Sequence, residues 1–363
     1  NGLNVGYRPF VGLIGDIKRR KPHYFDDYKQ GFHPKVVAST LFLFFACLAN
    51  AVAFGGLTGM VTGNAIGTVE MIVATAVGGI VFAIFSGQPL TILGGTGPIV
   101  IFTGLLYTAC ESLGINFLAT YAWVGLWSGL FLILQAIFNV SVLMRYFTKF
   151  TDEIFAALIA VIFIVEALKN MFSPMLADEF DPSVALLTMV LALGTYILSR
   201  AMKNFVRTPF TSRGIRNFIS DFGPAIAIGV MTIFALQFPG IELEVPKIPE
   251  KLATTTGRPW LVPLFDVPTW VIFGSIIPAL MATILLFLDQ NITTRLVNSP
   301  GNKLLKGAGF HLDLLVVGLI TIGCSIFGLP WIVAATVHAI NHVRSLADTK
   351  VVGSGNQHKE VID

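Results

Sequence analysis

The stretch SGQPLTILGGTGPIVIFTG, from Ser86 to Gly104, lies inside a long apolar region and decides how the chain can fold. It carries two prolines and five glycines, the residues that interrupt a helix most strongly. Backbone groups cannot stay unpaired in hydrocarbon, so an interrupted helix at membrane depth must be buried in protein or line a cavity. The stretch therefore predicts a broken span, with a short helix that begins near Gly97.

The composition predicts a membrane protein with several spans. Of the 363 residues, 54% are hydrophobic and only 12% are charged, and the mean hydropathy is +0.76. Soluble domains usually carry about 25% charged residues. The three cysteines lie in or beside apolar segments, without the spacing of metal ligands, which argues against a disulfide framework (Cys47, Cys110 and Cys324).

We predict ten spans of roughly bilayer length, separated by polar segments. They cover residues 35–55, 65–86, 88–108, 116–141, 152–172, 184–201, 217–237, 267–294, 312–328 and 329–346, of which 88–108 and 329–346 are broken. A polar segment at 1–34, an outer loop at 238–266 and a polar tail at 348–363 complete the predicted organisation.

Lysine and arginine residues predict the orientation of these spans. With the N-terminus in the cytoplasm, only four of the 24 Lys and Arg residues fall outside: Lys169, Lys247, Lys251 and Arg258. The basic segment 207–218 is then predicted to lie on the inner surface as an interfacial segment.

The second broken span, FGLPWIVAATVHAINHV from Phe327 to Val343, has the same order of features as the first. Each reads as an extended, proline-led segment followed by a half-length helix. Interrupted helices at corresponding places in two halves of a chain point to a transporter's binding site. Two helix N-termini that meet near the midplane would attract an anion. The alternative is a pair of proline kinks with glycines for close packing, as at Gly55/Gly59 and Gly125/Gly129.

Asp289 is the most informative single residue. It shares a helical face with Thr293, and a carboxylate with a hydroxyl offers oxygen ligands for a small cation. Hydropathy alone leaves open whether Asp289 is buried or interfacial, because 270–288 is already long enough to span. Asn50 is a candidate for helix packing or for supporting a site. His338 and His342, one turn apart, lack the partners of a metal site.

Soluble-enzyme motifs are absent: there is no G-x-S-x-G, Walker loop, H-E-x-x-H or dinucleotide fingerprint. The sequence thus predicts no enzyme, no cofactor and no nucleic-acid partner.

Several segments together resemble the bicarbonate transporter family, which contains band 3 anion exchangers and sodium-coupled bicarbonate cotransporters. They include GLIGDIKRRKPHYFDDY, NAVAFGGLTG, FSGQPLTILGGTGPIVIF, IIPALMATILLFLDQNITT, LLKGAGFHLDLLVVG and LPWIVAATVHAINHVRSLA, in the family's order, from about Gly12 to Ala347. Asp289-Gln290-Asn291-Ile292-Thr293 is similar to the sodium-coupled branch, since chloride/bicarbonate exchangers carry Glu at the first position.

The resemblance implies a fold of seven plus seven spans in two inverted repeats. Residues 35–237 would form the first repeat and 267–347 a partial second one, so that the chain is expected to end after span 10. Spans 3 and 10 would be half-helices between a core and a gate domain, and Asp289 would lie near the centre of its span.

The resemblance also implies two ion sites. Sodium, the only metal expected, would be held by Asp289, Thr293, Thr336 and the Val333 carbonyl. Bicarbonate or carbonate would lie against Thr96, Gly97, Ala334, Ala335 and His338, with support from Asn50. Two positions differ from the family pattern: His338 replaces an Arg or an aliphatic residue, and Thr103 replaces a common Glu.

The leading hypothesis is a secondary transporter that moves bicarbonate or carbonate with sodium by alternating access. The alternatives are sodium-independent exchange of chloride/bicarbonate or borate, which a charged His338 would favour, and a non-transporting membrane scaffold. The resemblance further suggests a homodimer in the plasma membrane.

Overall fold

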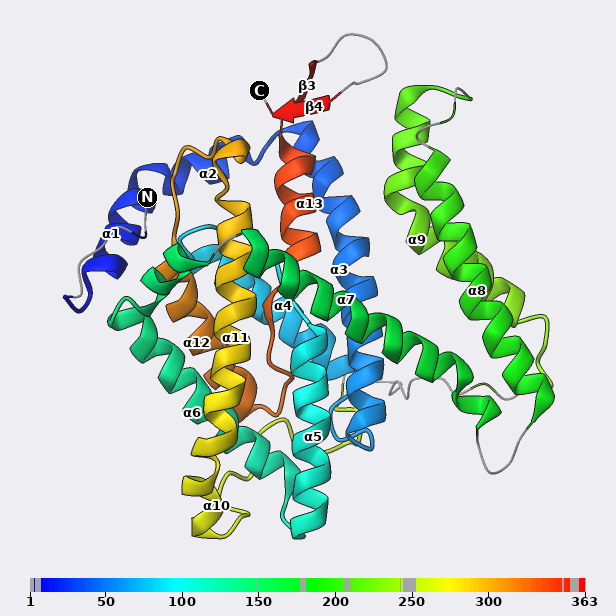
Figure 1. The fold of residues 1–363 in the computed structure, drawn as a ribbon, viewed down its shortest axis with the longest axis horizontal. Coiled ribbons are helices and arrows are strands. Elements are labelled where there is room, and N and C mark those ends of the chain that lie inside the picture. Colours follow the sequence, from blue (N-terminus) through cyan, green and yellow to red (C-terminus); the bar gives the residue numbers. More distant parts are fainter. Residues whose placement is uncertain are drawn as a thin grey trace. The chain divides into compact units, whose positions relative to one another are not determined.

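The structure is a computed structural model that describes residues 3, 8–147, 149–176, 181–205, 208, 210–241, 243, 253–347, 349–352 and 359–362. Helices dominate these ranges (Figure 1). They are α1 (Val11–Arg20), α2 (Tyr24–Gln30), α3 (Pro34–Val61), α4 (Thr68–Phe85), α5 (Gly97–Leu113), α6 (Phe117–Ile137), α7 (Lys149–Phe172), α8 (Pro182–Asn204), α9 (Arg213–Ala235), α10 (Thr269–Gly274), α11 (Ile276–Val297), α12 (Phe310–Ile326) and α13 (Thr336–Leu346). Two antiparallel pairs of short strands join β1 (Leu93–Gly94) to β2 (Val333–Ala334) and β3 (Thr349–Val352) to β4 (Lys359–Ile362).

The helices confirm the prediction of a polytopic membrane protein. In the described part of the chain, α3, α4, α6, α8 and the run from α10 through α11 are long and apolar enough to cross a membrane. Helices α5 and α12 and residues 226–235 of α9 are apolar but shorter. Each predicted broken span consists of a two-residue strand and a following helix, α5 or α13. The arrangement in inverted repeats and the repeat boundaries stay predictions.

Two segments contain elements that the sequence analysis did not predict. The basic segment 207–218 forms the start of α9 from Arg213 onward, its residues 207 and 209 lie outside the described ranges, and its position on the inner surface stays a prediction. A helix can extend beyond its apolar stretch because its backbone bonds do not require apolar side chains. The polar tail contains a hairpin, in which β3 and β4 pair as an antiparallel ladder.

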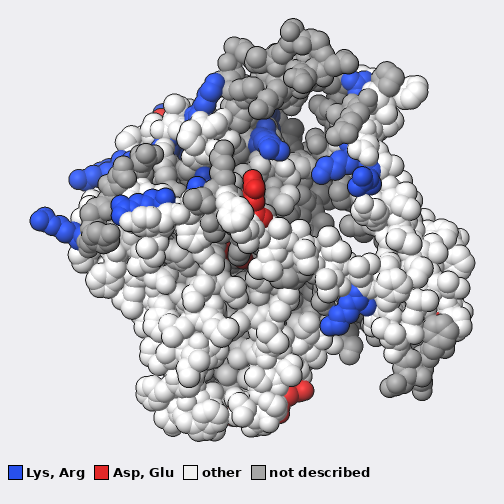
Figure 2. All heavy atoms as spheres, viewed as in Figure 1, with Lys and Arg blue, Asp and Glu red and all other residues white. Residues whose placement is uncertain are grey.

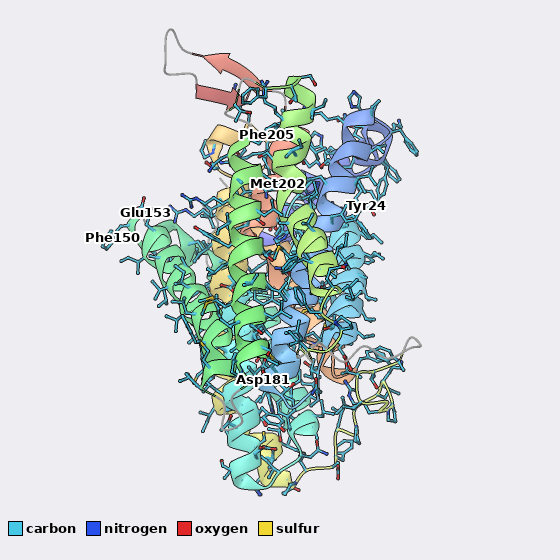
Figure 3. All side chains as sticks on the ribbon, turned by 90° about the vertical axis from the view of Figure 1, so that its right-hand side faces the viewer. Tyr24, Phe150, Glu153, Asp181, Met202 and Phe205 are labelled. Atoms are coloured by element: carbon cyan, nitrogen blue, oxygen red, sulfur yellow. The ribbon has the colours of Figure 1, made fainter. Side chains whose placement is uncertain are left out.

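The chain divides into two compact units, and the second holds residues 44–49 and 154–245. Its helices α8 and α9 run side by side; Figure 3 shows α8 along its length from Asp181 to Phe205. Close approach is possible because Gly194 faces Met231 and Gly223 faces Met202. The first unit holds residues 1–43, 50–153 and 246–363, including both broken spans.

Charge is unevenly distributed over the first unit. On the face in Figure 2, its Lys and Arg side chains gather around the N-terminal helices α1 and α2, and its lower part is almost wholly uncharged. This pattern is typical of a protein whose middle lies in lipid.

The centre of the first unit is the pair α6 and α12, which pack through glycines. A Cβ atom at Gly129 would lie 2.5 Å from Cγ1 of Ile322 and 2.8 Å from the carbonyl oxygen of Gly318. Gly55 of α3 meets Thr68 of α4 in the same way. Both predicted small-residue motifs are therefore places where two backbones approach closely.

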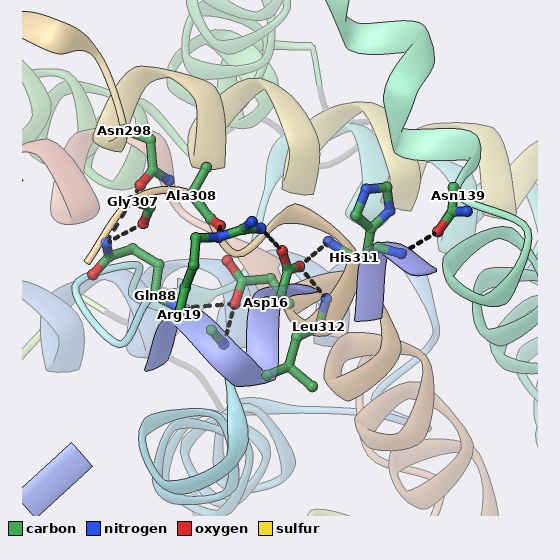
Figure 4. Close-up of polar contacts among 12 residues, drawn as sticks. Asp16, Arg19, Gln88, Asn139, Asn298, Gly307, Ala308, His311 and Leu312 are labelled. Atoms are coloured by element: carbon green, nitrogen blue, oxygen red, sulfur yellow. Dashed lines mark hydrogen bonds and ion pairs between the residues drawn. The ribbon is translucent and has the colours of Figure 1, made fainter. Parts of the chain in front are cut away.

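Helix α1 is tied to the start of α12 by a buried carboxylate (Figure 4). Asp16 pairs with Arg19 and accepts hydrogen bonds from the backbone N–H groups of His311 (2.8 Å) and Leu312 (3.0 Å). It thereby caps a helix other than its own. Burial raises the pKa of the Asp16 carboxyl from its ordinary 3.8 to about 6, although these donors and Arg19 act in the opposite direction.

A second carboxylate continues the connection to the first broken span. Asp313 of α12 accepts hydrogen bonds from the backbone N–H groups of Gly87 (2.7 Å) and Gln88 (3.0 Å). Gly87 and Gly309 are in backbone contact, since a Cβ on either would lie within 2.7 Å of the other's Cα. The entrance to the broken span is thus fixed to α12, and α12 is fixed to α1.

Gly129→Ala should destabilise the fold by about 1–3 kcal/mol, because the new methyl group meets backbone that cannot move aside. Gly323→Ala, on α12, is the matched control, since a Cβ there has no neighbour within 4 Å. We expect it to be neutral or slightly stabilising. Thermal unfolding of the detergent-solubilised variants measures both, and equal midpoints for the two would contradict the packing described here.

The raised pKa of Asp16 predicts a pH-dependent stability. The folded state holds this proton more tightly than the unfolded chain, so the contribution of Asp16 to folding is greatest below about pH 4 and falls as the pH rises towards 6. The midpoint of the native protein minus that of Asp16→Asn should therefore fall between about pH 4 and 6 and stay constant above about pH 7. A difference that does not vary with pH would contradict the assignment.

Candidate ion-binding site where two broken helices meet

The two broken spans meet in the interior of the first unit as a short ladder. Leu93 pairs with Ala334 and Gly94 with Val333. Beside the ladder, the N–H of Ala335 donates to the carbonyl of Ile92 over 2.8 Å. Each extended segment thus satisfies backbone groups of the other, which is what a break at membrane depth requires.

Glycine allows the first extended segment to lie against α3. A Cβ at Gly94 would come within 2.9 Å of the Asn50 side-chain oxygen, and one at Gly95 within 2.7 Å of Phe54 Cβ. Asn50 also donates from Nδ2 to the Gly95 carbonyl over 3.4 Å. The structure therefore places the predicted supporting residue Asn50 directly beside the break.

Helix α5 begins at the break without a side-chain cap. Thr96 occupies the cap position with extended backbone angles, and Pro98 lies in the first turn. A threonine in this place ordinarily accepts a hydrogen bond from its own helix, but Thr96 instead donates from Oγ1 to Asp289 Oδ2 over 2.8 Å. Helix α13 likewise begins after Ala335 without a side-chain cap. Two helix N-termini, each with backbone N–H groups and a positive dipole end, therefore flank the ladder.

Helix α11 contacts both half-helices through polar side chains one turn apart. Besides the bond between Asp289 and Thr96, Thr293 Oγ1 lies 2.6 Å from Thr336 Oγ1 and donates to the Ala334 carbonyl over 3.4 Å. Asp289 is only 5% exposed and lies well inside α11. Asp289 is therefore buried within the protein, and its depth in the membrane stays a prediction.

The remaining predicted site residues lie in the two broken spans, in or next to β2 and in the first turns of α5 and α13. Val333, Ala334 and Ala335 are buried in or directly after β2, and Gly97 is the buried first residue of α5. His338 lies in the first turn of α13 and is half-buried. The hydrogen bonds described above, which join α11 to the two half-helices, are made by residues other than His338.

Gln290 is a site residue that the sequence analysis missed. It is fully buried, its Oε1 accepts the N–H of Ala334 over 3.2 Å, and its Nε2 donates to Thr294. Gln290 directly follows Asp289 in a run of polar residues on an apolar helix, and this position could have indicated that it belongs to the site.

An aromatic stack that the sequence analysis also missed supports the second break. The rings of Trp331 and Tyr121 are parallel within 7°, with centroids 4.2 Å apart. The Tyr121 hydroxyl accepts the N–H of Trp331 over 3.0 Å, and Trp331 Nε1 donates to Ser325 over 2.9 Å. A buried tryptophan usually finds a partner for its N–H, so Trp331 in a proline-led break was a usable signal.

The arrangement has a defined chemical capacity. Asp289, Thr293 and Thr336 gather a carboxylate and hydroxyl groups, hard oxygen donors of the kind that bind small cations. The described residues contain no cluster of three His, Cys, Asp or Glu side chains that could hold a metal ion in another way. The two helix N-termini beside these oxygens favour an anion.

Interrupted helices that meet around buried polar groups define a class of protein, the polytopic membrane proteins with a fold typical of secondary transporters. Residues 8–180 and 173–362 match the HCO3⁻ transporter integral membrane domain, and the chain belongs to this family.

Relatives in the family include the band 3 anion transport protein of Rattus norvegicus, which is 36% identical over 93% of this chain. The sodium-driven chloride bicarbonate exchanger of Homo sapiens is 34% identical over 97% of the chain. The chain spans 39% and 38% of these two proteins. The transmembrane domain of the cyanobacterial bicarbonate transporter BicA has the same fold, with a TM-score of 0.62 over 87% of this chain and 79% of that domain at 18% identity.

Gln290→Leu should destabilise the folded protein by about 1–3 kcal/mol, because it leaves the buried N–H of Ala334 without an acceptor. Asn291→Leu is the matched control: Asn291 is equally buried, and its described hydrogen bond goes only to Phe287 in its own helix. Thermal unfolding compares the two variants. A loss in Asn291→Leu as large as that in Gln290→Leu would argue against a role for Gln290 in holding β2.

Proposed function

We propose that the protein is a secondary transporter that moves bicarbonate or carbonate together with sodium. One observation carries the proposal: the buried carboxylate of Asp289 touches Thr96 at the very start of α5. Cation ligands and a helix N-terminus are therefore neighbours, so that the two ions would bind beside each other. Family membership supports transport of this class of substrate.

Electrostatic repulsion gives a reason why binding of the anion would be coupled to binding of sodium. An ionised Asp289 beside the helix N-termini would repel an incoming anion strongly, because charges interact more strongly in a low-dielectric interior than in water. Sodium held by Asp289, Thr293, Thr336 and the Val333 carbonyl would cancel that repulsion. Each ion then raises the affinity for the other, as thermodynamic linkage requires.

The anion would lie against Thr96, Gly97, Ala334 and Ala335, where the N–H groups of the first helical turns act as donors. His338, in the first turn of α13, would face the same ion. Release to alternate sides of the membrane would follow from movement of the two half-helices relative to a gate, as in transporters of this construction. We place the protein in the plasma membrane, with the N-terminus in the cytoplasm and two copies per assembly.

A second candidate is sodium-independent anion exchange. The 36% identity with a band 3 anion transport protein supports it, and a protonated His338 could supply the positive charge in place of sodium.

Uptake of labelled bicarbonate into liposomes that contain the full-length protein tests the proposal. Uptake should require external sodium and show little dependence on internal chloride. Equal uptake with and without sodium, growing as the pH falls, would favour exchange through His338. Lack of saturable uptake under every condition would favour the scaffold alternative.

Asp289→Asn should abolish sodium-dependent uptake, with a loss of at least about tenfold, because the amide cannot balance the charge of the cation. Asp289→Glu should keep part of the activity. Asp266→Asn is the control, since the side chain of this exposed loop residue accepts its described hydrogen bond from Asn116. Full sodium-dependent uptake by Asp289→Asn would remove Asp289 from the mechanism.

A further inference from the structure

A cavity of about 510 Å³ lies between the N-terminal helices α1 and α2 and the helices α4 and α12, and its lining includes no residue of the ion-binding site. Its volume is within the range of about 300–1,000 Å³ typical of ligand pockets. The lining is mostly apolar and includes Ile17, Ile84, Leu315 and Val316. All of these elements belong to the first unit.

Cationic and aromatic side chains line one part of this cavity: Arg20, Lys21 and Tyr24. Arg20 is only 6% exposed, and its Nη2 donates to the Ala83 carbonyl over 2.9 Å. Its Nε and Nη1 are buried without a hydrogen-bond partner among the described residues. The ring of Tyr24 lies 4.9 Å from the guanidinium carbon, and Figure 3 shows Tyr24 on the N-terminal segment.

A buried guanidinium with two unsatisfied nitrogen atoms is costly unless an anion is close. Asp313 is near enough to act on Arg20 electrostatically. Both hydrogen bonds of Asp313, from the backbone N–H groups of Gly87 and Gln88, are made by Oδ1, and its Oδ2 is buried without a hydrogen-bond partner among the described residues. Arg20 Nε and Nη1 are therefore enclosed donors that no described residue accepts, and planar guanidinium groups suit phosphate oxygens well.

The apolar part of the cavity is open to the surroundings of the protein. Phe25 is 74% exposed, Phe85 61% and Leu319 53%, although each lines the cavity. Large apolar side chains exposed together mark a surface that meets lipid or another protein. A molecule that enters from the bilayer would thus meet apolar side chains along its tail and Arg20 with Lys21 at its head.

We propose that this cavity is a binding site for an anionic phospholipid, with an acyl chain along α12 and the phosphate at Arg20 and Lys21. Basic residues at the membrane surface favour a headgroup with net negative charge over a zwitterionic one. With the predicted orientation, the site faces the inner leaflet. The occupant would hold α1 and α2 against α4 and α12, next to the contacts of Asp16 in Figure 4.

Native mass spectrometry of the full chain in detergent tests the site. The probes are palmitoyl-oleoyl phosphatidylserine, the matching phosphatidylcholine, oleate and inorganic phosphate. Phosphatidylserine should bind at least about tenfold more tightly than phosphatidylcholine, because it alone has a net negative headgroup for Arg20 and Lys21. Oleate and inorganic phosphate, each with only part of the ligand, should bind more weakly than phosphatidylserine.

Variants of the cationic part provide the second comparison. Arg20→Gln should weaken phosphatidylserine binding at least about tenfold, and Arg20→Lys by less. Lys18→Gln is the control, because Lys18 is exposed on the same helix, carries the same charge and does not line the cavity. Equal binding of the two phospholipids, or equal effects of Arg20→Gln and Lys18→Gln, would overturn the proposal.

Variants of the apolar part keep the test decisive if Arg20→Gln does not fold. Leu319→Trp should fill the cavity and weaken phosphatidylserine binding, with Arg20 left intact. Leu280→Trp, at a similarly exposed position on α11, should have no effect. Unchanged binding in Leu319→Trp would overturn the proposal. The proposal would also be overturned if Arg20→Gln unfolded at a lower temperature but bound phosphatidylserine as well as the native protein does. Arg20 would then serve only to balance the negative charge of Asp313.

Discussion

Two helices break inside the membrane, and their exposed backbone groups must find partners without water. The four-residue ladder of β1 and β2, with the bond from Ala335 to Ile92, supplies those partners by bringing residues 92–94 and 333–335 together. Each broken helix therefore depends on the other, because the extended segment of one provides the hydrogen-bond partners for the extended segment of the other. Much of the surrounding structure serves to hold these two short segments in register.

Helix α11 is the element that makes the ladder a chemical site. It contributes Asp289 to the start of α5, Gln290 to the backbone of β2, and Thr293 to the start of α13. The same turns of one helix therefore contact both half-helices. Glycine packing between α6 and α12 and the stack of Tyr121 on Trp331 fix the second break from the other side.

Much of the fold could be predicted from the sequence because hydropathy and helix breakers are local signals. The ten predicted spans each overlap a helix, and both proline-led segments are extended where the glycines and prolines occur. The start of α9 and the hairpin in the tail were missed, since neither depends on hydropathy. Asp289, Thr293 and Thr336 could be named as a group only through the resemblance to a family. Spacing alone joins Asp289 to Thr293 on one helix but says nothing about Thr336.

The sequence by itself determined where the chain crosses lipid, where its helices break and which polar residues lie inside apolar segments. Those properties follow from side-chain hydrophobicity and backbone propensity, which act over a few neighbouring residues. Tertiary structure alone decided that Asp289 is buried against Thr96, that Gln290 holds Ala334, and that Arg20 lines an apolar cavity. These contacts join residues up to about 300 positions apart, such as Asp16 and Leu312. Only the packing of whole helices brings such residues together, and no local propensity encodes that packing.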